Sequence, residues 1–131
     1  MGLDITRYEM AQVTGKSRIH PDETIHNLGY IRGGCHNDIY TKLKLPTLYQ
    51  IFGIASTTPE PRYDNTLLMG RVEILRERIP KALHLARQTM CGLVKAGYNE
   101  NTREMRAIDA AIEMLEDMLY TGRGLYLEFI N

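Results

Sequence analysis

The feature that most constrains the fold is a run of apolar residues at helical spacing in the second half of the chain. It begins with Leu68, Val72, Leu75 and Ile79. Steps of four, three and four residues place these side chains on one face of a helix. Pro80 would normally interrupt a helix, but the stripe resumes in phase at Leu83. The pattern therefore predicts one long helix over about 65–96, kinked at Pro80.

A second apolar pattern predicts a helix over 102–120. Its main stripe is Met105, Ile108, Ile112, Leu115 and Leu119, with Ala107, Ala111, Met114 and Met118 beside it. Gly97 is expected to end the preceding helix in a left-handed conformation, and Asn101 with Glu104 resembles a capping box for the new one. The short polar connection predicts an antiparallel hairpin. The wide apolar arc predicts further packing, on a sheet or on another subunit.

Both ends of the chain have the composition of strands. Leu125 to Ile130 is rich in aromatic and aliphatic residues, and Leu3, Ile5, Arg7 and Tyr8 alternate with Asp4 and Thr6. A terminal strand needs a partner, so we expect the two termini to pair. The predicted fold class is α+β: a helical hairpin, with a long Pro-kinked helix and a second helix, packed on a small antiparallel sheet of the N- and C-terminal strands. Residues 1–131 are expected to form a single domain.

The segment between these parts is rich in Pro, Gly and His. The pattern predicts a helical turn over 20–29, a short strand over 30–32 and a helix over 37–45. Pro46 is expected to open a second short helix that ends at Phe52 or Gly53. Residues 54–62 are predicted to form a loop.

Composition limits the function classes. Sixteen basic residues balance sixteen acidic ones, so no net charge indicates a nucleic-acid partner. No run of 18 apolar residues is present, so we expect no membrane partner. The opening residues lack the profile of a signal peptide, and two distant cysteines suit a reducing compartment, so we expect a cytoplasmic protein.

A turn after the predicted strand 30–32 is a candidate anion site. Arg32, Gly33 and Gly34 combine a cation with two glycines whose amides can face an anion, and Lys42 and Lys44 would add charge. The spacing matches neither a P-loop nor a dinucleotide fingerprint. The alternative interpretation is a simple tight turn.

Tyrosine is over-used in this chain, with eight Tyr against two Phe and no Trp. Tyr30, Tyr40, Tyr49 and Tyr63 lie close in sequence to Arg32, Lys42, Lys44 and Arg62. Tyr and Arg are typical of binding hot spots, although a wet polar core would also use them. Cys35 and His36 invite a nucleophile or metal interpretation. A metal site would need a matching second ligand pair, and a catalytic thiol needs a base and an orienting group that the sequence does not single out, so no catalytic residue, metal or cofactor is predicted. Cys91 is expected to be a small core residue.

Acidic side chains gather on the second predicted helix. Asp109, Glu113 and Glu116 share one face, whereas the preceding helix is basic. Ion pairs between the hairpin arms would explain both sets, and an acidic surface for a basic partner is the alternative. The candidate binding residues are Tyr30, Arg32, Gly33, Gly34, His36, Tyr40, Lys42, Lys44, Asp109, Glu113 and Glu116.

Three segments resemble small uncharacterised proteins of tailed bacteriophages and prophages. They are Met1-Gly2-Leu3-Asp4-Ile5, Tyr30-Ile31-Arg32-Gly33-Gly34 and the closing strand from Leu125 to Phe129. The resemblance implies a phage origin and no reaction. The missing catalytic motif, the small size, the segregated charge and the Tyr/Arg-rich segment lead us to expect a non-enzymatic accessory protein. We expect it to bind and inhibit a host protein complex in the host-cell cytoplasm, as anti-CRISPR-like anti-defence inhibitors do. The alternative is a nucleotide or cyclic-nucleotide binder, a sponge, that uses the Arg32-Gly33-Gly34 turn. The apolar surface of the two long helices also predicts a homodimer.

Overall fold

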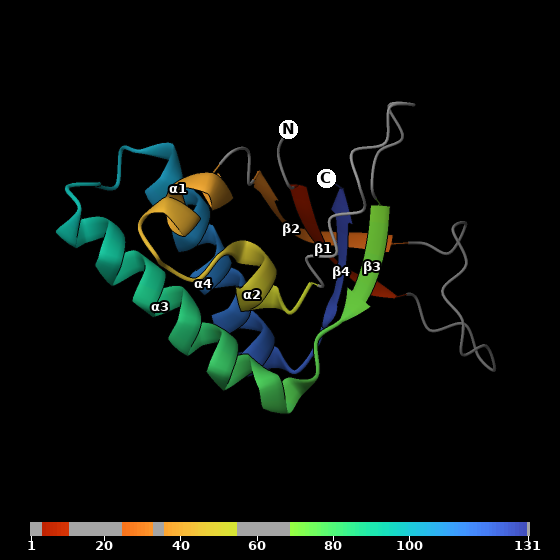
Figure 1. Ribbon diagram of the computed structural model, residues 1–131. Coiled ribbons are helices and arrows are strands. Elements are labelled where there is room, and N and C mark those ends of the chain that lie inside the picture. The colour runs from red at the N-terminus through yellow and green to blue at the C-terminus, as the bar shows by residue number, and fades with distance from the viewer. Residues whose placement is uncertain (1–3, 11–24, 33–35, 55–68, 131) are drawn as a thin grey trace.

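Helices gather on one side of an antiparallel sheet in the computed structural model, which describes residues 4–10, 25–32, 36–54 and 69–130 (Figure 1). Along the chain the elements are β1 (Asp4–Met10), β2 (Ile25–Arg32), α1 (His36–Lys42), α2 (Leu48–Phe52), β3 (Met69–Glu73), the 3₁₀ turn η1 (Arg76–Arg78), α3 (Ile79–Lys95), α4 (Arg103–Thr121) and β4 (Tyr126–Ile130). The predicted α+β class is confirmed.

The sheet has the strand order β2-β1-β4-β3, and every neighbouring pair is antiparallel. The predicted pairing of the two termini is confirmed, because β1 lies beside β4 with Ile5 opposite Phe129. Ile5 and Leu127 are buried against the helices, so the alternating pattern of each strand directs one face to the core. The sheet is larger than predicted, because β2 and β3 extend it on either side.

The prediction of one helix over 65–96 is wrong. Residues Met69–Glu73 form β3, and α3 begins only at Ile79. Pro80 therefore lies in the first turn of α3, where its missing amide has no intrahelical partner to lose, and it does not kink a longer helix. Between the two elements Ile74 is buried while Leu75 is 56% exposed, an alternation that suits extended chain. The helical spacing before Pro80 was a coincidence of a strand followed by a turn.

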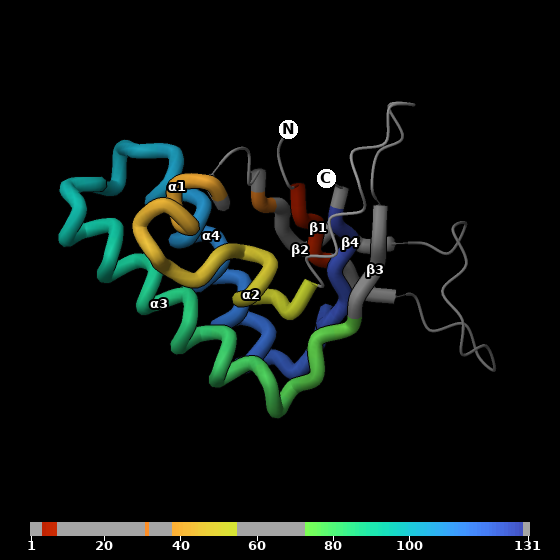
Figure 2. The backbone as a smooth tube through the Cα atoms, viewed as in Figure 1, coloured from red at the N-terminus to blue at the C-terminus, as the bar shows by residue number. Residues whose placement is uncertain are grey.

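The predicted hairpin is confirmed, with α3 and α4 antiparallel (Figure 2). Gly97 ends the first arm at φ 93°, and its amide donates to Val94 O at 3.1 Å while the Tyr98 amide donates to Leu93 O at 3.0 Å. These two bonds form a Schellman motif. The predicted Asn101 cap is wrong, because Thr102 occupies the N-cap position of α4.

The wide apolar arc of α4 is covered within one chain. Its buried residues are Met105, Ala107, Ile108, Ala111, Ile112, Met114, Leu115 and Met118. They pack on α3, on β2 and on α1. Of the two alternatives for the arc, the sheet is therefore the one observed, and one hydrophobic core joins sheet and helices. The homodimer stays a prediction.

The segment before β3 differs partly from prediction. Ile25 to Gly29 belong to β2 and not to the helical turn predicted over 20–29, whose first five residues lie outside the described residues; the predicted strand 30–32 is the end of β2. The strand forms because β1 pairs with β2 on both sides of a bulge at Leu28. The helix predicted over 37–45 is present as α1, and the one after Pro46 as α2. The predicted turn at Gly33-Gly34 and the loop over 55–62 lie outside the described residues, whereas Ile54 is buried.

Arg7 is a buried cation that joins β1 to the turn before β4. Its side chain is 3% exposed, and its Nε donates to Gly124 O at 2.9 Å. One terminal nitrogen donates to Arg123 O at 2.8 Å, and the other pairs with the carboxylate of Asp117 on α4. The guanidinium thus satisfies carbonyls at the α4–β4 turn and stabilises the pairing of the two termini.

Candidate functional site: a cationic groove beside α3

The predicted binding residues near α1 do not form one surface. Tyr40 is fully buried, and its hydroxyl donates to Glu104 O at 2.6 Å. It is therefore a core residue that connects α1 to α4, and it cannot contact a ligand at the surface. Burial raises the pKa of the Tyr40 hydroxyl far above its usual value, and the nearby Glu104 carboxylate adds to the effect. Lys42 and Lys44 are both exposed.

The predicted anion turn is described only in part. Tyr30 and Arg32 lie in β2 opposite Thr6 and Asp4 of β1, and His36 begins α1. Gly33 and Gly34 lie outside the described residues. The anion-binding interpretation of this turn therefore stays a prediction.

The acidic residues of α4 divide into two groups. Glu116 accepts a hydrogen bond from Arg87 of α3 at 3.2 Å, the inter-arm ion pair that the charge pattern indicated. Asp109 and Glu113 are exposed and have no ion-pair partner among the described residues. Both side chains of the Arg87–Glu116 pair are more than half exposed, so the pair stabilises the hairpin by at most about 1 kcal/mol.

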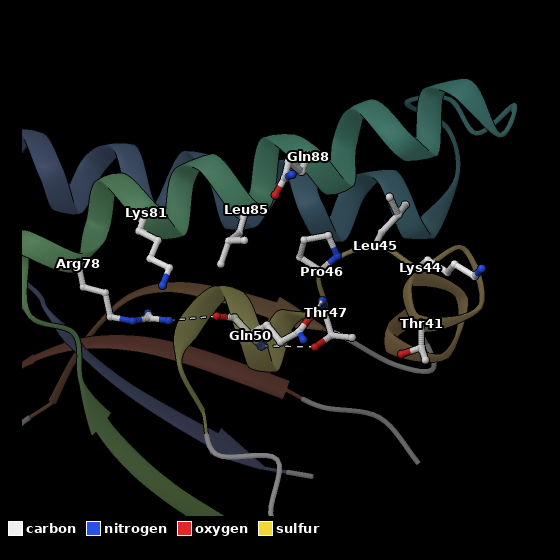
Figure 3. A pocket seen from close by; sticks show the side chains of 10 residues that line it. All are labelled: Thr41, Lys44, Leu45, Pro46, Thr47, Gln50, Arg78, Lys81, Leu85 and Gln88. Carbon is white, nitrogen blue, oxygen red and sulfur yellow. Dashed lines mark hydrogen bonds between the residues drawn. The ribbon is translucent and has the colours of Figure 1, made fainter.

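A groove of about 750 Å³ lies between α3 and the segment that joins α1 to α2 (Figure 3). It is open to solvent, and its described lining is Thr41, Lys44, Leu45, Pro46, Thr47, Gln50, Arg78, Lys81, Leu85 and Gln88. Three of these side chains are cations, and none of the described lining residues is acidic. Arg78 and Lys81 lie at one end of the groove, and Lys44 lies at the other with its amine directed outward (Figure 3). The charge of this groove favours an anionic ligand.

The wall formed by α2 is fixed at both ends. Thr47 and Gln50 form a capping box, in which the Gln50 amide donates to Thr47 Oγ1 and the Thr47 amide donates to the Gln50 side chain. At the other end Arg78 donates to Gln50 O at 3.0 Å and to Ile51 O at 3.1 Å. Gly53 allows this approach, because a Cβ there would lie 2.8 Å from the Arg78 guanidinium carbon. Arg78 is therefore held in place before any ligand arrives.

The loop residues Leu45 and Pro46, which form the floor of the groove, pack closely against α3. A Cβ at Gly92 would lie 2.2 Å from a methyl carbon of Leu45, so only glycine admits this packing. The buried hydroxyl of Thr89 donates to Pro46 O at 2.7 Å. Glycine inside a helix costs about 1 kcal/mol relative to alanine. The chain thus gives up helix stability at the place where the loop that lines the groove meets α3.

Both lysines in the described lining of the groove occupy positions at which a lysine lowers the stability of the fold. Lys44 has φ 60°, the left-handed conformation in which glycine is usual at a helix end. The bonds Lys44 N to Thr41 O and Leu45 N to Tyr40 O, at 3.0 and 2.8 Å, place it at the glycine position of a Schellman motif. Lys81 lies in the first turn of α3, which contains no acidic residue, and a cation there opposes the helix dipole.

Sequence reasoning missed most of this groove. Arg78, Lys81, Leu85 and Gln88 are spaced by three, four and three residues, a stripe that was visible as one face of a helix. The charge pattern predicted only that this helix is basic, and it did not predict that Arg78 and Lys81 would line a groove. The opposing wall could not be assigned, because it depends on Leu45 docking at Gly92.

No group of three or more His, Cys, Asp or Glu side chains gathers in the described part of the chain in a way that could hold a metal ion. The expectation that Cys91 is a core residue is wrong, because its side chain is exposed on the outer face of α3. The helices that the structure describes are all too short or too polar to span a bilayer.

No protein-family model, curated protein or solved structure matches this chain.

Proposed function

We propose that this protein acts by binding, and that the cationic groove beside α3 holds the anionic part of its ligand. The observation that carries the proposal is the pair of cations Arg78 and Lys81 at one end of a groove without a described acidic residue, with Lys44 at its other end (Figure 3). The proposal keeps an anionic ligand, as in the nucleotide-binding expectation, but places it on these residues.

Two lysines of the groove lower the stability of the folded chain, and this supports the proposal. A lysine in a left-handed conformation costs roughly 1–2 kcal/mol, and a cation in the first turn of a helix costs a few tenths of a kcal/mol. Residues that lower local stability concentrate at functional sites, where their chemistry is needed in that place. Lys44 and Lys81 each meet this description, and they belong to different walls of the same groove.

The test is an NMR titration of the ¹⁵N-labelled protein with pyrophosphate, ATP and pentaglutamate. Amide signals from the groove should shift with at least one of these probes, and Lys81→Gln should weaken binding at least fivefold. Lys95→Gln is the matched control, because Lys95 is an exposed lysine in the last turn of the same helix. Shifts that are absent with all three probes, or equal in both variants, would overturn the proposal.

A second candidate function follows from the exposed side of α4. It is the expectation from sequence, a phage-encoded accessory protein that binds and inhibits a host complex. Asp109 and Glu113 are exposed without an ion-pair partner among the described residues, and Tyr120 on the same helix is 89% exposed. Exposed aromatic side chains such as Tyr120 are typical of protein interfaces, in which tyrosine is enriched, and the two acids beside it on α4 would favour a basic partner.

The second candidate is tested by pull-down from host lysate. The wild-type protein should retain one stoichiometric protein, which the Asp109→Asn, Glu113→Gln double variant loses. Glu100→Gln, an exposed acid in the hairpin turn, is the control and should retain it. A retained protein that is indifferent to the double variant would place the contact elsewhere.

A further inference from the structure

The groove is long enough for several residues of an extended chain. The wall formed by the end of η1 and by α3 runs from Arg78 to Gln88, which corresponds to about 15 Å along a helix axis. An extended peptide advances about 3.3 Å per residue, so four to five residues span this length. The groove is open to solvent, so a segment of a longer chain can lie in it.

The chemistry changes along the groove. Arg78 and Lys81 make one end cationic, whereas Leu85 with Leu45 and Pro46 makes the middle apolar (Figure 3). None of the described lining residues is aromatic, so the groove lacks the stacking surface that nucleobases use. The polar side chains of Gln88 and Thr41 can both donate to and accept from a peptide backbone.

The spacing of these features matches a peptide better than a compact anion. Lys81 and Leu85 are four residues apart, or about 6 Å along the helix. In an extended chain, residues i and i+2 face the same side and are about 6.6 Å apart. An acidic side chain at Lys81 would therefore place the side chain two residues away over Leu85.

We propose that the groove captures an extended acidic segment of a partner protein, with an acidic side chain at Arg78 and Lys81 and an apolar side chain two residues away over Leu85. This inference rests on the proposed function and names its ligand class. The charged end selects the acid, and the apolar floor distinguishes a peptide from a small phosphate or a nucleotide.

The test compares four short peptides by NMR titration of the full chain. The probes are Ser-Asp-Ser-Leu-Ser, its reverse Ser-Leu-Ser-Asp-Ser, and two forms of the former in which Asp is replaced by Asn or Leu by Ser. We expect one of the two directions to bind at the groove, and each replacement in that direction to weaken binding at least fivefold. Because the replacements are in the peptide, no folding defect of the protein can imitate them.

Protein variants separate this inference from the proposed function. Leu85→Gln, at a half-buried position, should weaken the Leu-containing peptide but leave pyrophosphate binding unchanged, whereas Lys81→Gln should weaken both. If pyrophosphate or ATP binds in the groove and the Leu of the peptide adds nothing, the inference is overturned while the proposed function stands. Tighter binding of a short single-stranded RNA than of any peptide would also overturn it. No binding by any probe would overturn both.

Discussion

The buried Arg7 allows a quantitative prediction about what holds the two ends of the chain together. Arg7→Met keeps an unbranched apolar side chain in the site but removes three hydrogen bonds, to Gly124 O, Arg123 O and Asp117. Hydrogen bonds to a charged group contribute about 1.5–3 kcal/mol each, and a buried carbonyl left unpaired costs about 1–3 kcal/mol. Gly124 is buried whereas Arg123 and Asp117 are exposed, so only one partner loses access to water. After allowance for the apolar contacts of Met, we expect the free energy of unfolding to fall by about 3 kcal/mol.

The matched variant is Asp117→Asn. The Asp117 side chain is 57% exposed, so its ion pair with Arg7 contributes at most about 1 kcal/mol, and the guanidinium keeps both carbonyl bonds. Urea unfolding followed by circular dichroism measures both free energies, provided that the dependence on urea is the same for all variants. A loss below about 1 kcal/mol for Arg7→Met, or an equal loss for both variants, would refute the reasoning that the carbonyls of the α4–β4 turn dominate.

Four further predictions test individual elements. Lys44→Gly should raise the free energy of unfolding by about 0.5–1 kcal/mol in urea unfolding, because glycine relieves the left-handed strain, while anion binding weakens. Gly92→Ala should lower stability by about 1 kcal/mol, because displacement of Leu45 outweighs the gain in helix propensity; a net gain would contradict the close packing. Tyr40→Phe should cost about 1 kcal/mol at neutral pH through loss of the bond to Glu104 O. The folded-state pKa of Tyr40 is raised, so its stabilising effect is full below about pH 10, where unfolded tyrosine titrates, and is lost as the pH rises above that; the difference between wild type and variant in urea unfolding should shrink there, and a constant difference would exclude this cause. The homodimer predicted from sequence is checked by light scattering, and a species of 15.0 kDa alone would remove that prediction.

The helical hairpin and the terminal strands could be predicted because their signals are local and redundant. The apolar stripe from Met105 to Leu119 defines α4 in any environment that offers a core, and Gly97 ends α3 through its own backbone preference. Pairing of the termini followed from two alternating strands without other partners. The error at Pro80 arose because apolar residues of a strand and a turn happened to continue a helical period.

The groove shows where local patterns stop being informative. The sequence by itself determined that two cations and the apolar Leu85 share one side, since a helical spacing places Arg78, Lys81 and Leu85 together. It did not determine that Lys44 would lie in the same groove, because that depends on Leu45 packing at Gly92 and on Thr89 holding Pro46. Nor did it separate Tyr40, a core residue, from the exposed Lys42 two positions away. Periodicity is a property of neighbours in the chain, whereas the groove is made by contacts between segments more than forty residues apart, and only the packed tertiary structure decides those.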